Sequence, residues 1–170
     1  MTSTLEAQEQ RAWRVLHTVL DPEVPVLSVC DLGIVREVRA DGASVTVTLT
    51  PTYSGCPATE VIEQSVRDAL AAEGFEQIHT RLSRAPAWTT DWISEDGRRK
   101  LKEYGIAPPG HLLQEPGAPV PIRIHPRETV ACPRCDSTQT ERLSAFGATA
   151  CKALYRCISC REPFEHFKPI

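Results

Sequence analysis

Alternating apolar and polar residues indicate the strands of an N-terminal domain. Residues 45–50 alternate three apolar side chains with three threonines, a pattern typical of a strand with one buried face. Asp41-Gly42 comes just before and is a hairpin-turn signal, so residues 34–38 are predicted to form the preceding strand. Residues 75–82 form a third predicted strand.

Apolar residues at helical spacing predict two longer helices, over residues 5–20 and 57–73. The first is expected to end before Pro22, because the residue that precedes a proline disfavours the helical conformation. Gly74 suits the end of the second helix. A shorter helix is predicted over residues 94–104, with acidic side chains in its first turn and basic ones later, the order that the helix dipole favours.

The order of these elements is α-β-β-α-β and predicts a small α+β domain over residues 1–105. A strand–helix–strand unit implies a parallel pair with a right-handed crossover, so we expect a three-stranded sheet with its helices on one face. Six prolines between residues 106 and 126 predict a stiff, proline-rich linker over 106–128. Two Cys-x-x-Cys pairs that follow the linker predict a β-rich zinc ribbon over 129–170.

Two Cys-x-x-Cys pairs carry the clearest chemical signal in the chain. They are Cys132/Cys135 and Cys157/Cys160, with 21 residues between the two pairs. Four thiolates in a tetrahedron form the closed structural site that Zn²⁺ prefers, and we predict one structural zinc. Two disulfides, or a four-thiolate iron or iron–sulfur site, are the alternatives. Cys151 offers a nearby fifth thiol and is predicted to lie outside the metal shell.

Cys56 is the second chemical candidate. It precedes the predicted second helix and follows Gly55, and a helix N-terminus favours a thiolate and lowers its pKa. Such a cysteine can be a nucleophile or a metal ligand. A small buried cysteine that only starts the helix fits the sequence equally well.

Several other residues have a structural reading and a functional one. Trp88 and Trp92 either cap the core or form a docking surface, and burial is favoured. Asp21 and Glu23 are read as turn residues rather than acidic ligands, and Cys30 as a packing residue.

Composition and charge exclude several classes of protein. The chain is 41% apolar and 24% charged, as expected of a soluble globular protein. No signal peptide or membrane-spanning run is apparent, and seven cysteines, four of them in metal spacing, suit the reducing cytoplasm. Residues 1–82 carry six basic and twelve acidic side chains, and residues 129–170 carry six basic and four acidic side chains. We therefore expect no nucleic-acid partner and no membrane partner, since phosphate binding needs a basic field.

No known set of catalytic residues can be recognised in the sequence. The chain lacks a nucleotide-binding glycine motif and a Ser/His/Asp set. A di-iron oxygenase needs two Glu-x-x-His pairs on helices, whereas the single Glu-x-x-His here, Glu76 to His79, falls in the predicted third strand. We therefore expect no enzymatic activity from this chain alone.

Residues 8–105 resemble the SufT-like family of cytosolic iron–sulfur assembly factors. The motifs are Asp21-Pro22-Glu23-Val24-Pro25, Asp31-Leu32-Gly33-Ile34-Val35, Leu49-Thr50 and Gly55-Cys56-Pro57. The resemblance implies that Cys56 is the reactive cysteine, a transient ligand for iron or an iron–sulfur cluster, and that iron–sulfur delivery is the role.

Nearly the whole chain resembles one branch, the PaaD-type family of bacterial 1,2-phenylacetyl-CoA epoxidase components. Four further stretches carry this likeness: Trp88-Thr89-Thr90-Asp91-Trp92, residues 104–109, residues 146–153 and Glu162-Pro163-Phe164. The C-terminal Lys168-Pro169-Ile170 holds no cysteine, although some relatives are expected to carry one there.

The second resemblance implies a non-catalytic accessory subunit in aerobic phenylacetate catabolism. Such a protein would help to assemble the phenylacetyl-CoA epoxidase complex or deliver metal to it. Its partners would be the di-iron oxygenase, that enzyme's structural partner or the reductase, and a homodimer is left open. The alternative is a passive structural or regulatory subunit of the same complex.

Overall fold

The computed structural model of the protein describes residues 2–42, 44–53, 55, 57–110 and 129–170. They form two compact units, Met1–Gly97 and Arg98–Ile170, and each is described by itself. Within these residues no helix is long and apolar enough to cross a membrane. The α+β fold class predicted from the sequence is confirmed. The exact ranges 1–105, 106–128 and 129–170 remain a prediction, and residues 111–128 of the predicted linker lie outside the described residues.

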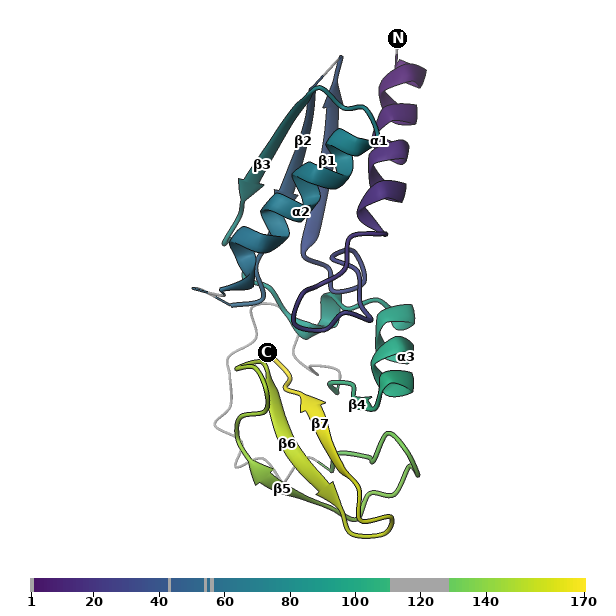
Figure 1. The fold of residues 1–170 in the computed structure, drawn as a ribbon, viewed down its shortest axis with the longest axis vertical. Coiled ribbons are helices and arrows are strands. Elements are labelled where there is room, and N and C mark those ends of the chain that lie inside the picture. The colour runs from purple at the N-terminus through teal and green to yellow at the C-terminus, as the bar shows by residue number, and fades with distance from the viewer. Residues whose placement is uncertain (1, 43, 54, 56, 111–128) are drawn as a thin grey trace. The chain divides into compact units, whose positions relative to one another are not determined.

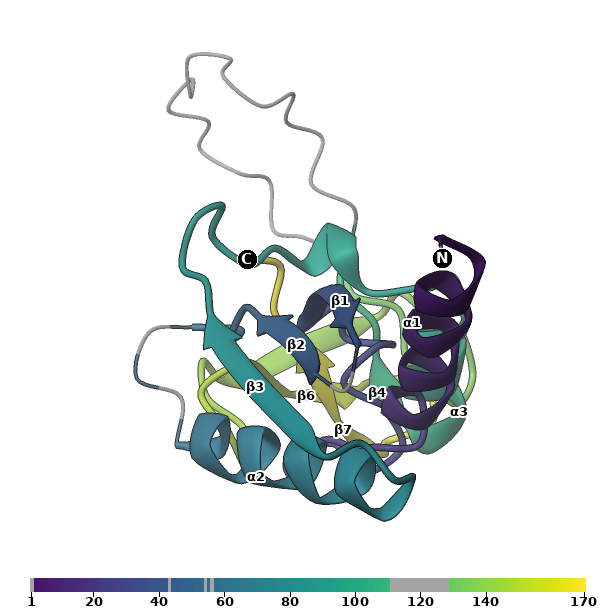
Figure 2. The ribbon, with the colours of Figure 1, turned by 90° about the horizontal axis from the view of Figure 1, so that it is seen from above.

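The first unit contains the predicted α-β-β-α-β order. Its elements are α1 (Thr2–Leu16), β1 (Val35–Asp41), β2 (Ser44–Leu49), α2 (Ala58–Ala72), β3 (Gln77–Leu82) and the short 3-10 helix η1 (Thr90–Trp92). Strand β2 is central, antiparallel to β1 and parallel to β3. Helices α1 and α2 cover the same face of this sheet (Figures 1 and 2), as the sequence predicted.

The core of the first unit lies between this sheet and its helices. Val45, Val47 and Leu49 are buried, while the threonines between them are only partly so. Val66 and Leu70 of α2 are fully buried as well. Each such side chain stabilises the fold by about 1.5–3 kcal/mol relative to exposure.

The first helix ends earlier than the sequence predicted. We expected it to reach residue 20, but α1 ends at Leu16. Leu20 instead pairs with Ser28 in an isolated β-bridge, and the backbone N–H of Asp21 donates to the carbonyl of Leu27 at 2.8 Å. Backbone partners from the following loop thus replace the last turn of the helix.

The loop after α1 is built by buried aspartates. The Asp21 carboxylate accepts hydrogen bonds from the backbone N–H groups of Glu23 and Val24, at 2.9 and 2.8 Å. The Asp31 carboxylate accepts from the backbone N–H and the hydroxyl of Ser28, both at 2.9 Å. These contacts confirm the reading of Asp21 as a turn residue.

The tryptophan segment packs onto this loop. Trp88 is 4% exposed, and its indole N–H donates to the carbonyl of Leu32 at 2.9 Å. Gly33 has a φ of +68°, and a Cβ there would lie 2.5 Å from the carbonyl oxygen of Trp92. The guanidinium of Arg36 stacks on the Trp92 ring, 3.6 Å from its centre. The prediction that Trp88 is buried is confirmed.

The second unit is a four-stranded sheet in the order β4-β7-β6-β5. Its strands are β4 (Ile106–Ala107), β5 (Thr140–Ser144), β6 (Lys152–Cys157) and β7 (Pro163–Phe167). Helix α3 (Glu95–Tyr104) begins in the first unit and continues into the second. Strands β5, β6 and β7 are antiparallel neighbours, whereas β4 runs parallel to β7.

Strand β4 was not predicted from the sequence, which placed its two residues at the start of the linker. Ile106 and Ala107 pair with Glu165 and His166. They are only 4% and 1% exposed. Gly105, with a φ of +95°, ends α3 and turns the chain toward the sheet, so this apolar pair is buried before the prolines begin.

Candidate metal centre

The two Cys-x-x-Cys turns have the same backbone geometry. In each, the N–H of the first cysteine donates to the carbonyl five residues later: Cys132 to Ser137 at 2.9 Å and Cys157 to Glu162 at 3.0 Å. In each, the residue after the second cysteine has a positive φ, 58° at Asp136 and 65° at Arg161. This reversal of the chain directs both thiols of a turn to one side.

The four sulfur atoms form one compact group. The Sγ atoms of Cys132, Cys135, Cys157 and Cys160 all lie within 4.8 Å of one another. The Cys132–Cys160 and Cys135–Cys157 distances are 3.7 and 3.6 Å. A tetrahedral zinc with Zn–S bonds of about 2.3 Å places its sulfurs about 3.8 Å apart. None of the described cysteines forms a disulfide, so the donor set and its spacing fit a four-thiolate metal site rather than two disulfides.

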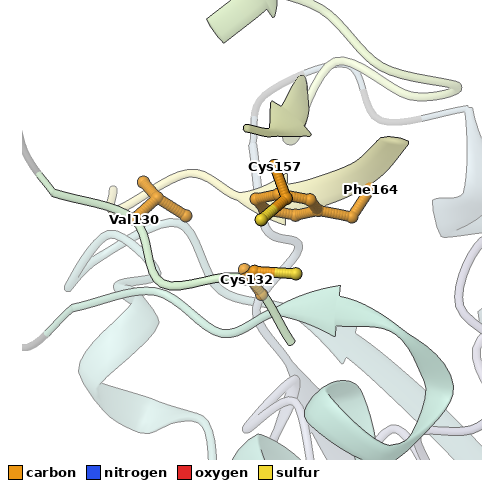
Figure 3. Close-up of a cluster of buried hydrophobic side chains, with 5 residues drawn as sticks. Val130, Cys132, Cys157 and Phe164 are labelled. Atoms are coloured by element: carbon orange, nitrogen blue, oxygen red, sulfur yellow. The ribbon is translucent and has the colours of Figure 1, made fainter. Parts of the chain in front are cut away.

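Each turn contributes one buried and one exposed thiol. Cys132 and Cys157 are fully buried and belong to a small core with Val130, Phe164 and Ala107 (Figure 3). Tyr155 packs against this core, whereas Cys135 and Cys160 are exposed. The buried pair anchors the site in the sheet, and the exposed pair closes it on the solvent side.

Hydrogen bonds between the turns hold them together. The Ser137 and Ser159 hydroxyls are 2.7 Å apart, and the N–H of Ile158 donates to the carbonyl of Gln139 at 2.8 Å. The N–H of Cys160 donates to the Cys157 sulfur at 3.5 Å, and this bond, together with those from neighbouring thiols, lowers the pKa of the Cys157 thiol to about 6. Desolvation and hydrogen bonds with the other thiols raise the pKa of the Cys135 thiol to about 12, so the negative charge of the metal-free group resides on Cys157. A ligand that is already a thiolate near neutral pH favours metal binding.

Helix α3 and strand β4 also support the first turn. The Lys102 ammonium pairs with Asp136 at 2.6 Å. Ala107 reaches the core around Cys132. The sequence reading missed both residues, although an apolar Ile106-Ala107 pair directly before a proline-rich run was a usable signal.

The remaining cysteines occupy different surroundings. Cys151 is buried and lies outside the four-sulfur group; its sulfur is 3.0 Å from the Thr149 hydroxyl. Burial, reinforced by Asp31, raises the pKa of the Cys30 thiol to about 12, which suits a packing residue and not a nucleophile. Cys56 lies outside the described residues, so its predicted role stays a prediction.

A site with four protein thiolates has no open position for a substrate. Its chemistry is therefore structural: it joins two turns that hydrophobic burial alone would hold weakly in so small a unit. A zinc bound there would leave a net charge of about −2 on the ligand set.

Two family models match the chain. Residues 117–168 match the PaaD zinc beta ribbon domain, and residues 9–77 match an iron–sulfur cluster assembly protein. The first range covers the four cysteines of the metal group, and the second covers α2 and most of the first sheet.

Known relatives span one unit or both. The PaaD-type subunit of 1,2-phenylacetyl-CoA epoxidase from Escherichia coli (strain K12) is 48% identical over 164 residues, which are 96% of this chain and 94% of that protein. An Fe–S protein maturation auxiliary factor from Porphyromonas gingivalis is 40% identical over 55% of this chain and 90% of its own length. A solved domain of unknown function from Bacillus anthracis superposes with a TM-score of 0.57 at 27% identity, over 59% of this chain and 97% of that domain.

Proposed function

Because the chain belongs to the PaaD-type family of 1,2-phenylacetyl-CoA epoxidase subunits, we propose that it is a non-catalytic accessory component of that multicomponent enzyme. Its role is to help assemble the ring epoxidase of aerobic phenylacetate catabolism, or to deliver iron or an iron–sulfur cluster to it, in the cytoplasm. One observation carries the proposal. A unit that matches iron–sulfur assembly proteins and a PaaD-type ribbon are joined in one chain.

In this proposal the ribbon holds one structural zinc through Cys132, Cys135, Cys157 and Cys160. The support is the single group of four sulfurs at tetrahedral spacing. The metal stabilises the ribbon and takes no part in delivery, because all four of its positions are filled by protein.

The delivery function falls to the first unit. Iron or a cluster is the cargo, and Cys56 is its transient ligand. The support is the match of residues 9–77 to iron–sulfur cluster assembly proteins, together with the position of Cys56 two residues before α2 begins at Ala58. The partners are the di-iron oxygenase, its structural partner or the reductase of the complex.

The test combines metal analysis with the state of the oxygenase in cells. Protein purified without oxygen should hold one zinc that resists mild chelation, plus iron that chelators remove readily. In a strain that lacks the chain, the oxygenase should accumulate with little iron and regain it when the chain is restored. A fully iron-loaded oxygenase in the deletion strain would contradict the proposal.

A passive structural or regulatory subunit is the second candidate. One observation favours it: outside the four-sulfur group, the described cysteines are Cys30, with a pKa raised to about 12, and the buried Cys151. In that case the deletion strain would contain iron-loaded oxygenase subunits that fail to assemble.

A further inference from the structure

The connection between β5 and β6 presents an exposed aromatic ring. Phe146 is 64% exposed, the highest value among the large hydrophobic residues that the structure describes, and Leu143 three positions earlier is 51% exposed. Single exposed apolar residues are common on protein surfaces. Phe146 differs from such residues because hydrogen bonds hold the backbone on both sides of it.

Four consecutive residues of this loop, 145–148, each have a backbone group in a hydrogen bond. The carbonyl of Ala145 accepts from the Lys168 ammonium at 3.2 Å, and the N–H of Phe146 donates to the Ser144 hydroxyl at 3.1 Å. The N–H groups of Gly147 and Ala148 donate to the Lys152 carbonyl and the Glu165 carboxylate, both at 2.7 Å. The ring is therefore carried by a short loop whose backbone is held at four consecutive residues.

A buried ion pair lies beneath the loop. The Lys152 ammonium, on a side chain only 5% exposed, pairs with Glu165 at 2.8 Å. The other oxygen of Glu165 lies so close to the loop that a Cβ on Gly147 would approach it to 2.6 Å. One carboxylate thus links two strands to the loop, and a Cβ on Gly147 would have to displace it.

One positive charge lies beside the ring. The Lys168 ammonium lies 4.7 Å from the centre of the Phe146 ring. Arg142 is exposed and makes no ion pair among the described residues. A partner that receives the ring would meet the Lys168 ammonium beside it, and the exposed Arg142 lies four residues earlier in the chain. Such a partner should therefore offer carboxylates around an apolar socket.

We propose that this loop is a docking element, which inserts Phe146 into an apolar, carboxylate-rimmed pocket on another protein. The proposal rests on the proposed function for the identity of that protein, another component of the epoxidase complex. A ring on a backbone that is ordered before binding costs less conformational entropy on binding than a ring on a flexible loop, which suits an anchor residue.

The charge of the ribbon favours a protein over a nucleic acid or a membrane. Residues 129–170 carry six basic and four acidic side chains, and four thiolates around a zinc add about two negative charges. Phosphate backbones and anionic lipid surfaces need a stronger positive field than this.

The test measures binding of the zinc-loaded full chain to each purified epoxidase component, immobilised one at a time. Phe146→Ala should raise the Kd for one component about tenfold or more, as expected for an aromatic anchor. Arg142→Glu should raise the Kd several-fold and reduce its salt dependence. Tyr104→Ala is the matched control, since Tyr104 is an aromatic residue 57% exposed on the same unit, and its Kd should equal that of the wild type.

Zinc content and melting temperature should be unchanged in the Phe146→Ala and Arg142→Glu variants, because both side chains are exposed. A wild-type Kd for Phe146→Ala overturns the docking proposal and leaves the proposed function standing. If the wild-type chain binds no component, the docking proposal also fails; the iron content of the oxygenase in the deletion strain then decides the proposed function separately. A third result would also overturn the docking proposal. In that result, Phe146→Ala weakens binding to an oligonucleotide or to an anionic vesicle but leaves binding to every epoxidase component unchanged.

Discussion

Two single residues show how strongly the metal turns constrain the backbone. Asp136 and Arg161 occupy equivalent positions with positive φ, where a residue with a Cβ costs about 1–2 kcal/mol. Aspartate tolerates this conformation better than arginine does, and Asp136 also pairs with Lys102. The two positions should therefore respond differently to glycine.

Arg161→Gly is expected to stabilise the zinc-loaded ribbon by about 0.5–1 kcal/mol, because relief of backbone strain outweighs the added freedom of the unfolded chain. Asp136→Gly should bring no gain, since it removes the Lys102 pair. Denaturant unfolding of the two variants beside the wild type measures this. Equal or lower stability of Arg161→Gly would contradict the prediction.

His166 should make the ribbon sensitive to acid. Burial lowers its pKa to about 4, from 6.5, so the folded protein keeps the ring neutral. Between these two values the unfolded chain binds the proton that the folded chain does not, and stability therefore falls as the pH falls from about 6.5 to about 4. The loss at the acid end is on the order of 3 kcal/mol.

His166→Phe keeps a ring against Tyr155 and should remove this contribution. The zinc thiolates also lose stability in acid, but that loss is common to both proteins, so the difference between their pH profiles isolates His166. Parallel profiles between pH 4 and 7 would show that His166 does not contribute.

At the scale of the element, the ribbon depends on its metal. Cys132→Ser is expected to lose zinc and to unfold β5, β6 and β7, because Cys132 lies in the small core of the second unit. Helices α1 and α2 and their sheet should keep their hydrogen-exchange protection. Loss of protection in both units together would show that they fold as one.

Strand β4 should contribute measurably to the ribbon. Ala107 is 1% exposed in the core around the cysteines, so Ala107→Asp buries a carboxylate there and should destabilise the ribbon by several kcal/mol, about 3 or more. Ala131→Asp is the control, since Ala131 is exposed and adjoins Cys132. Zinc retention under chelator challenge should fall for Ala107→Asp alone. Equal zinc retention by the two variants would contradict a role for β4.

At the scale of the whole molecule, substitution of Cys56 tests whether the first unit delivers metal while the ribbon only holds a structural zinc. Cys56→Ser should cost little stability, because a serine can cap the helix that follows, but it should impair growth on phenylacetate and lower the iron content of the oxygenase. A hydroxyl is a poor ligand for soft metals and a poor nucleophile at neutral pH. Cys30→Ala is the control and should support normal growth. Full growth and full iron loading with Cys56→Ser would favour the passive role.

The sequence by itself determined which faces of the longer elements are apolar and which cysteines pair in one turn, because both depend on neighbours a few positions apart. Alternation in residues 45–50 and helical spacing in residues 58–72 report which face of an element is apolar, and the structure buries those faces. The Cys-x-x-Cys spacing likewise determines that two thiols of one turn can meet one metal. These are short-range properties, and a single segment contains all the information they require.

Tertiary structure alone decided the features that join distant segments. Strand β4 has two residues, too few for any periodicity, and it exists because Ala107 pairs with His166 on β7. Helix α1 stops at Leu16 because the loop after it supplies other backbone partners. Glu165 similarly braces the loop around Phe146 across the sheet. Such contacts depend on which chain segments meet in space. A local pattern such as the apolar Ile106-Ala107 pair indicates burial, but it does not identify the segment against which the pair is buried.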